Sequence, residues 1–194
     1  MKQIVIALLA ILVVGAALAA DVLKTDTTDY TLDQPSRIQI TGELTVNSPT
    51  WHRWRPDSYS ELSLDCQLNF TYEYTTDPYY DMYCFNVSTG DPVEFVVDGA
   101  DFDTVLYIYC DPFDPGASTV NGVFMDDDDG EGLLSAIMAT DGVTLTPGND
   151  YWLVVCAYST TYGAYSIQTS DNVSLCGSVP ADDTNWSSLK ALFR

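Results

Sequence analysis

Short β-rich runs recur along this chain at intervals of about 8 to 12 residues, and they narrow its possible folds more than any other feature. Gly, Pro, Asp and Asn separate the runs, and no long segment of the body has the 3.6-residue apolar period of a helix. The pattern predicts an all-β fold, an antiparallel β-sandwich. The expected strands are residues 37–44, 62–74, 82–87, 93–97, 104–110, 135–139, 151–158 and 164–169.

Two of these runs, 104–110 and 151–158, are the most apolar, and we expect them to be central strands buried on at least one face. The chain has 194 residues, of which 46% are hydrophobic and 12% aromatic. A chain of this size and composition has enough apolar surface to form a core.

The amino-terminal residues have the features of an export signal. Lys2 precedes an apolar run over residues 4–20, and a small-x-small cleavage sequence ends at Ala19. This arrangement is typical of a secretory signal peptide over residues 1–20. The alternative is an uncleaved membrane anchor, for which the run is short. We expect a secreted or cell-surface protein with no transmembrane segment after signal cleavage.

Acidic residues outnumber basic ones, with 28 Asp and Glu against 7 Lys and Arg and a formal net charge of -21. No Lys or Arg occurs between Arg55 and Lys190. This composition excludes nucleic acid as a partner, because phosphate binding requires a basic face. Cations from the medium are expected to relieve the repulsion among the acids of the body.

The most acidic segment places five carboxylates within six residues, from Asp126 to Glu131. A hard divalent cation bound by oxygen ligands, calcium above all, relieves such repulsion. Asp101 and Asp103, in the turn before an expected central strand, are predicted to converge on this loop. The candidate metal ligands are Asp101, Asp103, Asp126, Asp127, Asp128 and Asp129. The alternatives are a solvated acidic loop and, for the first two residues, side-chain caps on the turn.

The segment Trp51–Arg55 combines basic and aromatic residues. Its candidate contacts with a sugar ring or with an acidic face of a second copy are Trp51, Arg53, Trp54 and Arg55. A loop packed over one end of the sandwich is the alternative. His52, the sole histidine, has two arginines nearby that are expected to lower its pKa. The chain shows no common catalytic motif, and we expect no enzyme activity and no catalytic residue.

Five cysteines follow the signal sequence, and export makes disulfides plausible. An odd number leaves one thiol unpaired or shared with another chain. One hypothesis is a hairpin closed by Cys66 and Cys84, which flank a turn-rich stretch at 75–78. The pairing of the others is not readable from the sequence. The candidates are Cys66, Cys84, Cys110, Cys156 and Cys176.

The carboxyl-terminal segment differs from the strand-rich body. Asp183 or Thr184 is a suitable N-cap for a short helix, and basic residues at the end of this helix suit its dipole. Helical spacing places Trp186, Leu189 and Phe193 on one face. We expect this face to dock on the sandwich itself, on a neighbouring chain, or on an export or anchoring machine.

Three stretches resemble, in order and spacing, motifs of the bacterial pre-peptidase C-terminal domain. They are YCFNVSTGDPVEF at 83–95, FDTVLYIY at 102–109, and a third run from DDDDG at 126–130 through LTPG at 145–148 and YWLVV at 151–155 to GAYSI at 163–167. The resemblance implies a jelly-roll-like β-sandwich in a secreted, usually non-catalytic module. Some members of the family bind calcium, and some attach to insoluble polymers. Asp126 stands where the family usually has Asn, which adds negative charge to the loop.

We therefore expect four segments: a signal peptide over 1–20, an extension over 21–36, the sandwich over 37–171 and a tail over 172–194. The first functional hypothesis is a secreted module that binds an extracellular ligand or polymer with the help of calcium. The second is a structural subunit that assembles with copies of itself into a filament, surface layer or matrix. Its contacts would be the basic-aromatic segment, the odd cysteine or the tail.

Overall fold

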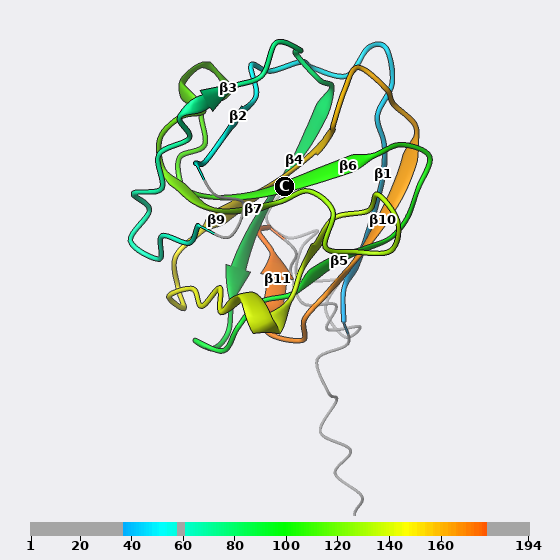
Figure 1. Ribbon diagram of the computed structural model, residues 1–194. Helices are drawn as coiled ribbons and strands as arrows, with labels where there is room; N and C mark the ends of the chain where they lie inside the picture. Colours follow the sequence, from blue (N-terminus) through cyan, green and yellow to red (C-terminus); the bar gives the residue numbers. More distant parts are fainter. Residues whose placement is uncertain (1–36, 58–60, 178–194) are drawn as a thin grey trace, which may run out of the picture. The chain divides into compact units, whose positions relative to one another are not determined.

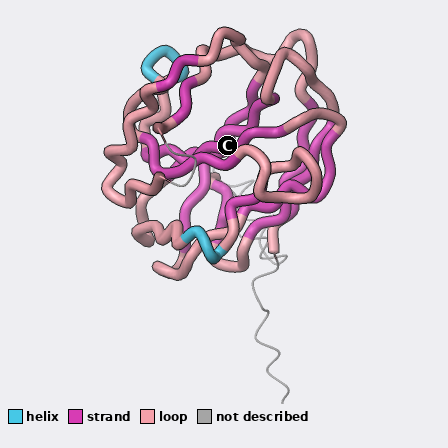
Figure 2. The backbone as a smooth tube through the Cα atoms, viewed as in Figure 1, coloured by secondary structure: helices cyan, strands magenta, loops and turns pink. Residues whose placement is uncertain are grey.

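Antiparallel strands joined by loops make up almost all of the regular structure (Figures 1 and 2). The computed structural model describes residues 37–57 and 61–177. Within these ranges, helical structure is limited to two 3-10 turns, Pro115–Ala117 and Ala139–Asp141. The all-β class predicted from the sequence is confirmed.

The larger sheet has five antiparallel strands in the order β11–β4–β9–β6–β7. The strands are β11 (Val173–Leu175), β4 (Tyr80–Val87), β9 (Tyr151–Ala157), β6 (Thr104–Cys110) and β7 (Gly122–Asp126). β6 pairs with β9 over its whole length and with β7 on its other side. Every residue of β6 is buried, so both faces of the sheet are covered at this strand.

The smaller sheet has four antiparallel strands in the order β1–β10–β5–β8. The strands are β1 (Gln39–Glu43), β10 (Ala164–Thr169), β5 (Phe95–Ala100) and β8 (Ala136–Ile137). Buried and more exposed residues alternate along β10 and over the first residues of β5, as expected for strands with one face toward a core and the other toward solvent.

The main core lies between the two sheets. Leu106 and Ile108 of β6 belong to the same buried cluster as Phe95 of β5 and Ile167 of β10. The rings of Phe85 and Phe95, on opposite sheets, pack edge to face with centroids 4.9 Å apart. Two sheets that share one core in this way form a β-sandwich.

A further layer covers the outer face of the larger sheet. This outer layer consists of residues 50–56 and 61–79 and contains a two-stranded sheet of β2 (Trp54–Arg55) and β3 (Tyr72–Glu73). Its residues Trp51 and Phe70 form a second buried cluster with Tyr107 and Tyr109, which alternate along β6 with the core-facing residues. The Tyr107 hydroxyl donates to the backbone oxygen of Trp54 at 3.0 Å.

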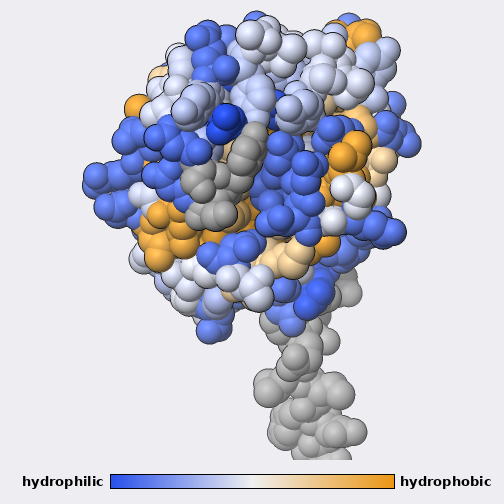
Figure 3. Space-filling model, viewed as in Figure 1, coloured by the Kyte–Doolittle hydropathy of each residue, from blue (hydrophilic) through white to orange (hydrophobic). Residues whose placement is uncertain are grey.

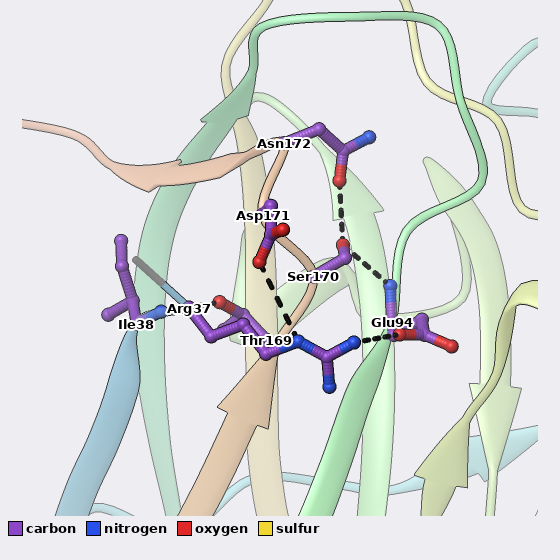
Figure 4. A network of polar contacts seen from close by, with 7 residues as sticks. All are labelled: Arg37, Ile38, Glu94, Thr169, Ser170, Asp171 and Asn172. Carbon is purple, nitrogen blue, oxygen red and sulfur yellow. Dashed lines mark hydrogen bonds and ion pairs between the residues drawn. The ribbon is translucent and has the colours of Figure 1, made fainter. Parts of the chain in front are cut away.

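A polar network closes one end of the smaller sheet (Figure 4). Arg37, just before β1, lies 3.6 Å from Glu94. The backbone N–H of Ile38 donates to Thr169 Oγ1 at 3.1 Å, and that of Glu94 donates to Ser170 Oγ at 2.9 Å. The ion pair is exposed and contributes about 0–1 kcal/mol. The backbone hydrogen bonds tie the ends of β1, β10 and β5 together.

Two disulfides join parts of the chain that are distant in sequence. Cys66 of the outer layer pairs with Cys110 at the end of β6, and Cys84 of β4 pairs with Cys176 just after β11. The hypothesis of a hairpin closed by Cys66 and Cys84 is therefore wrong. The segment that carries Cys66 runs along β7, because the backbone N–H groups of Ser63 and Leu68 donate to the backbone oxygens of Val123 and Gly122. Cys66 therefore lies near the end of β6, away from the strand that carries Cys84.

Most expected strands agree with the structure, and residues 104–110 and 164–169 have the predicted bounds. The strand expected over 62–74 is wrong for most of its length, because only Tyr72–Glu73 is extended and paired as a strand. Leu68 and Phe70 have the two-residue spacing of a strand, but they lie in an irregular segment. Both side chains cover the outer face of β6 and β7, and this gives them their spacing. β2, β7 and β11 were not predicted.

Several expectations lie outside the described residues: the signal peptide, the extension and the tail helix with Trp186, Leu189 and Phe193. Within the described residues, no helix has the length and apolar character needed to cross a membrane. Hydrophilic residues cover most of the face seen in Figure 3, with hydrophobic residues gathered in smaller patches.

Candidate functional site

Strand register brings three aspartates together at one end of the larger sheet. Asp103 immediately precedes β6, whereas Asp127 and Asp128 immediately follow β7. Because the two strands are antiparallel neighbours, the start of β6 lies beside the end of β7. Tyr158, just after β9, donates its backbone N–H to the backbone oxygen of Asp103 at 2.8 Å. The ends of three neighbouring strands, β9, β6 and β7, therefore meet here.

The carboxylates of Asp103, Asp127 and Asp128 form an acidic triad, in which one oxygen of each lies within 4.8 Å of the others. Asp127 is only 8% exposed, whereas Asp128 is exposed to solvent. Oδ1 of Asp103 and Oδ1 of Asp127 are buried and have no hydrogen-bond partner among the described residues. Buried carboxylate oxygens rarely stay unpartnered in folded proteins, so these two atoms call for a ligand.

Strand alternation gives the adjacent Asp126 and Asp127 different roles. Successive side chains of β7 point to opposite faces, so Asp126 points toward the smaller sheet and Asp127 toward the outer layer. Asp126 Oδ2 accepts from the backbone N–H of Ala136 in β8 at 2.6 Å and from that of Asp129 at 3.4 Å. Asp126 therefore ties the two sheets together and lies outside the acidic triad.

Buried hydroxyl groups hold the backbone that carries the triad. Ser135 Oγ lies 2.6 Å from the backbone oxygen of Thr104 and 2.8 Å from that of Asp127, and it donates to these two oxygens. The backbone N–H of Ser135 donates to Thr104 Oγ1 at 2.9 Å. Both residues are fully buried. This network fixes the segment after β7 against the start of β6 and so positions Asp103 and Asp127.

A buried arginine of the outer layer acts on the same site. Arg53 has no exposed surface, and its three guanidinium nitrogens have no hydrogen-bond partner among the described residues. The guanidinium lies over the ring of Tyr74, 3.7 Å from its centroid, and 4.8 Å from that of Tyr158. Its charge interacts electrostatically with Asp103 and Asp127.

Burial disfavours the charged forms of these carboxylates. Desolvation raises the pKa of Asp127 to about 6, with a further contribution from Asp128 and an opposing one from Arg53. Desolvation likewise raises the pKa of Asp103, and it raises that of Asp126 to about 7 against the hydrogen bond from Ala136. A bound cation would offset the cost of ionising Asp103 and Asp127, which suits oxygen coordination of a hard divalent ion.

The remaining candidate ligands lie outside the triad. Asp101 accepts from the backbone N–H of Ala164, the first residue of β10, at 3.2 Å. This bond joins two distant segments and is not a cap on the turn of Asp101 itself. Asp129 is exposed and is not part of the triad. Of the six aspartates expected as ligands, the structure brings together Asp103, Asp127 and Asp128.

The basic-aromatic segment does not present all of its side chains to solvent. Trp51 is 3% exposed and Arg53 is fully buried, so the expectation that these two side chains form an exposed contact surface is wrong. Both side chains point from the outer layer toward the larger sheet, where Trp51 packs against residues of β6 and Arg53 lies near Tyr158. Trp54 and Arg55 are half-buried, with Arg55 4.3 Å from the ring centroid of Tyr72.

His52 has acidic partners that its sequence neighbours did not reveal. Its Nδ1 lies 2.8 Å from Asp77, and its Nε2 lies 2.7 Å from Glu73. The hydrogen bonds with Asp77 and then Glu73 raise the pKa of His52. The expectation that nearby arginines lower this pKa is wrong, because the Arg53 side chain points inward and the imidazole meets carboxylates of β3 and the following loop.

A proton NMR titration will test this pairing, and one histidine makes its assignment unambiguous. We expect a His52 pKa above the ordinary 6.5, which Asp77→Asn lowers toward that value. Protonated His52 stabilises the fold fully below pH 6.5, and this contribution is lost as pH rises through the raised pKa. Glu43→Gln, on the smaller sheet, is the control and should leave the pKa unchanged. A wild-type value below 6.5 would contradict the pairing.

The fifth cysteine is not available for an intermolecular bond. Cys156 is free and fully buried beneath the outer layer, and burial raises the pKa of its thiol to about 12. A second cluster of possible ligands joins Cys84, Asp150 and Cys176, but its two sulfur atoms form a disulfide. This leaves the acidic triad as the candidate cation site of the described residues.

Sequence reasoning did not assign a role to Ser135 or Thr104, and it placed Arg53 on the surface. If residues 123–127 (VFMDD) had been recognised as a strand, the alternation of side-chain direction would have placed Asp126 and Asp127 on opposite faces. A comparison with models of known protein families found no match, and a comparison with curated proteins found none either.

Proposed function

We propose that this chain is an exported, non-catalytic β-sandwich module that holds a divalent cation at the acidic triad and binds an extracellular ligand or surface. The observation that carries the proposal is the pair of buried, unpartnered oxygens of Asp103 and Asp127 beside the exposed carboxylate of Asp128. Calcium is the expected ion, because it accepts oxygen ligands in flexible geometry and is abundant outside cells.

The triad residues would supply oxygen ligands from two strands of the larger sheet. Asp103 and Asp127 lie on backbone fixed by Ser135, whereas Asp128 is exposed and gives the ion access to solvent. A cation held in this way would link the start of β6 to the end of β7. The charge of the ion would also offset the repulsion among the acids of this end of the sheet.

The resemblance to pre-peptidase C-terminal domains supports the same function, since that family contains non-catalytic modules of exported proteins. The apolar run over 4–20 and the two disulfides support export. The self-assembling alternative is less supported, because Cys156 and part of the basic-aromatic segment, Trp51 and Arg53, are buried.

Thermal unfolding with calcium and with a chelator will test the cation site. An ion that binds only the folded protein stabilises it by about 1.4 kcal/mol at ten times its Kd. We expect Asp127→Asn and Asp128→Asn to abolish this gain and to change stability little in chelator. Asp129→Asn removes the same charge one residue away and should keep the gain. Equal melting temperatures of the wild type in calcium and in chelator would contradict the proposal.

A binding test completes the proposal. The purified mature protein would be incubated with insoluble cellulose, chitin and fibrillar collagen, in calcium and in chelator. We expect retention on at least one of these polymers in calcium, with release in chelator and no retention of Asp128→Asn. Failure to bind any of them in calcium would count against the polymer-binding role and leave the cation site to the thermal experiment.

A further inference from the structure

Arg53 is a charged group that the fold buries without a direct partner. It has no exposed surface, and Nε, Nη1 and Nη2 all lack hydrogen-bond partners among the described residues. Stacking against Tyr74 and Tyr158 offsets part of the cost of removing the guanidinium from water. A buried charge nevertheless requires a nearby opposite charge, so the residues around Arg53 should include one or more ionised carboxylates.

The acidic triad is the opposite charge. Arg53 interacts electrostatically with Asp127, and its charge opposes the rise in pKa that burial causes at Asp103 and Asp127. Tyr158 connects the two features, because its ring lies beside the guanidinium while its backbone N–H binds the backbone of Asp103. Tyr158 therefore links the buried arginine to the backbone of the triad.

The other basic residues of the described ranges face elsewhere. Arg37 pairs with Glu94 and Asp171, and Arg55 lies over Tyr72. Arg53 is the basic residue whose charge acts on Asp103 and Asp127. Arginine suits this position better than lysine, because its planar guanidinium is weakly hydrated, stacks on rings and stays charged when buried.

We propose that Arg53 is a specificity-determining residue. Its fixed positive charge reduces the net negative charge of the triad and so favours a divalent over a trivalent ion. This inference rests on the proposed function, in which the triad holds a cation. Three ionised carboxylates and one guanidinium leave a site with two net negative charges, which a divalent ion neutralises. Without the guanidinium the same ligands would carry three net charges and favour a trivalent ion. Arg53 accordingly weakens trivalent binding more than divalent binding, because its repulsion grows with the charge of the bound ion.

Competition between terbium and calcium will test this inference. Terbium binding is followed by luminescence sensitised by nearby aromatic rings, and calcium is used as the competitor at pH 7.5. We expect Arg53→Met to increase the affinity for both ions and to raise the ratio of terbium to calcium affinity about tenfold or more. Arg53→Lys keeps a positive charge and should leave the ratio near that of the wild type.

A second substitution covers the case in which Arg53→Met does not fold. Arg53→Gln also removes the positive charge but keeps a polar side chain, and all three carboxylates of the triad stay in place. We expect Arg53→Gln to raise the terbium-to-calcium ratio about tenfold or more as well. An unchanged ratio in the folded Arg53→Met or Arg53→Gln variant, with calcium still bound by the wild type, would overturn the role of Arg53. A wild type that binds neither ion would instead overturn the proposed cation site itself.

Discussion

Replacing Cys84 and Cys176 together by serine is expected to lower the free energy of unfolding by roughly 4–5 kcal/mol. The two cysteines are separated by 92 residues, and a crosslink over so long a loop removes much of the conformational entropy of the unfolded chain. The folded state loses little in the exchange, because both positions are only partly buried and serine fits the space. Urea unfolding of the double variant and the wild type measures the difference.

The control for this experiment is Cys156→Ala, which removes a buried sulfur but no crosslink. Its expected cost is about 1 kcal/mol, from the small cavity that it leaves. Peptide mapping of the unreduced protein checks the connectivity independently. Peptides that join Cys66 to Cys84, or a cost of the double serine variant below that of Cys156→Ala, would contradict the disulfide arrangement.

Trp51→Ala is the second substitution with a large expected effect, a loss of about 3–5 kcal/mol. Trp51 is 3% exposed and packs against four aromatic residues, three of the larger sheet and Phe113 of the loop after β6. Its ring centroid lies 5.1 Å from that of Tyr107 and 5.6 Å from that of Phe113, both in edge-to-face contacts. Removing the indole leaves a cavity in the cluster that joins the outer layer to β6.

Trp54→Ala is the matched control, because Trp54 lies on the same segment but is half-buried. Its loss should be about 1 kcal/mol, within the ordinary range for a partly exposed position. Chemical denaturation of both variants, followed by circular dichroism, gives the two values. Equal and small losses would contradict the burial of Trp51 and support the exposed contact role that was one hypothesis from the sequence.

The sequence predicts the sandwich well where burial alternates along a strand or fills it completely. Residues 104–110 and 164–169 are of these two kinds, and their bounds were predicted correctly. The outer layer was not predictable in the same way. Leu68 and Phe70 have strand-like spacing, yet they are buried by contact with a sheet formed elsewhere in the chain, which local periodicity cannot reveal.

The candidate site was only partly predictable, because it also depends on contacts between segments that are distant in sequence. A run of aspartates indicates a possible cation site, but the choice of Asp127 and Asp128 over Asp126 depends on strand β7 and on the face to which each residue points. Asp103 could be proposed because it precedes an obvious strand. The electrostatic influence of Arg53 on Asp127 depends on the outer layer, which brings together segments far apart in sequence.

The position of the second disulfide has a mechanical consequence. β11 is a three-residue edge strand, and a pulling force applied beyond residue 177 would otherwise peel it from β4 one hydrogen bond at a time. Cys176 carries that load through a covalent bond into β4, the strand next to the middle of the larger sheet. A sandwich tethered by its carboxyl-terminal segment would therefore bear tension without unzipping at its edge.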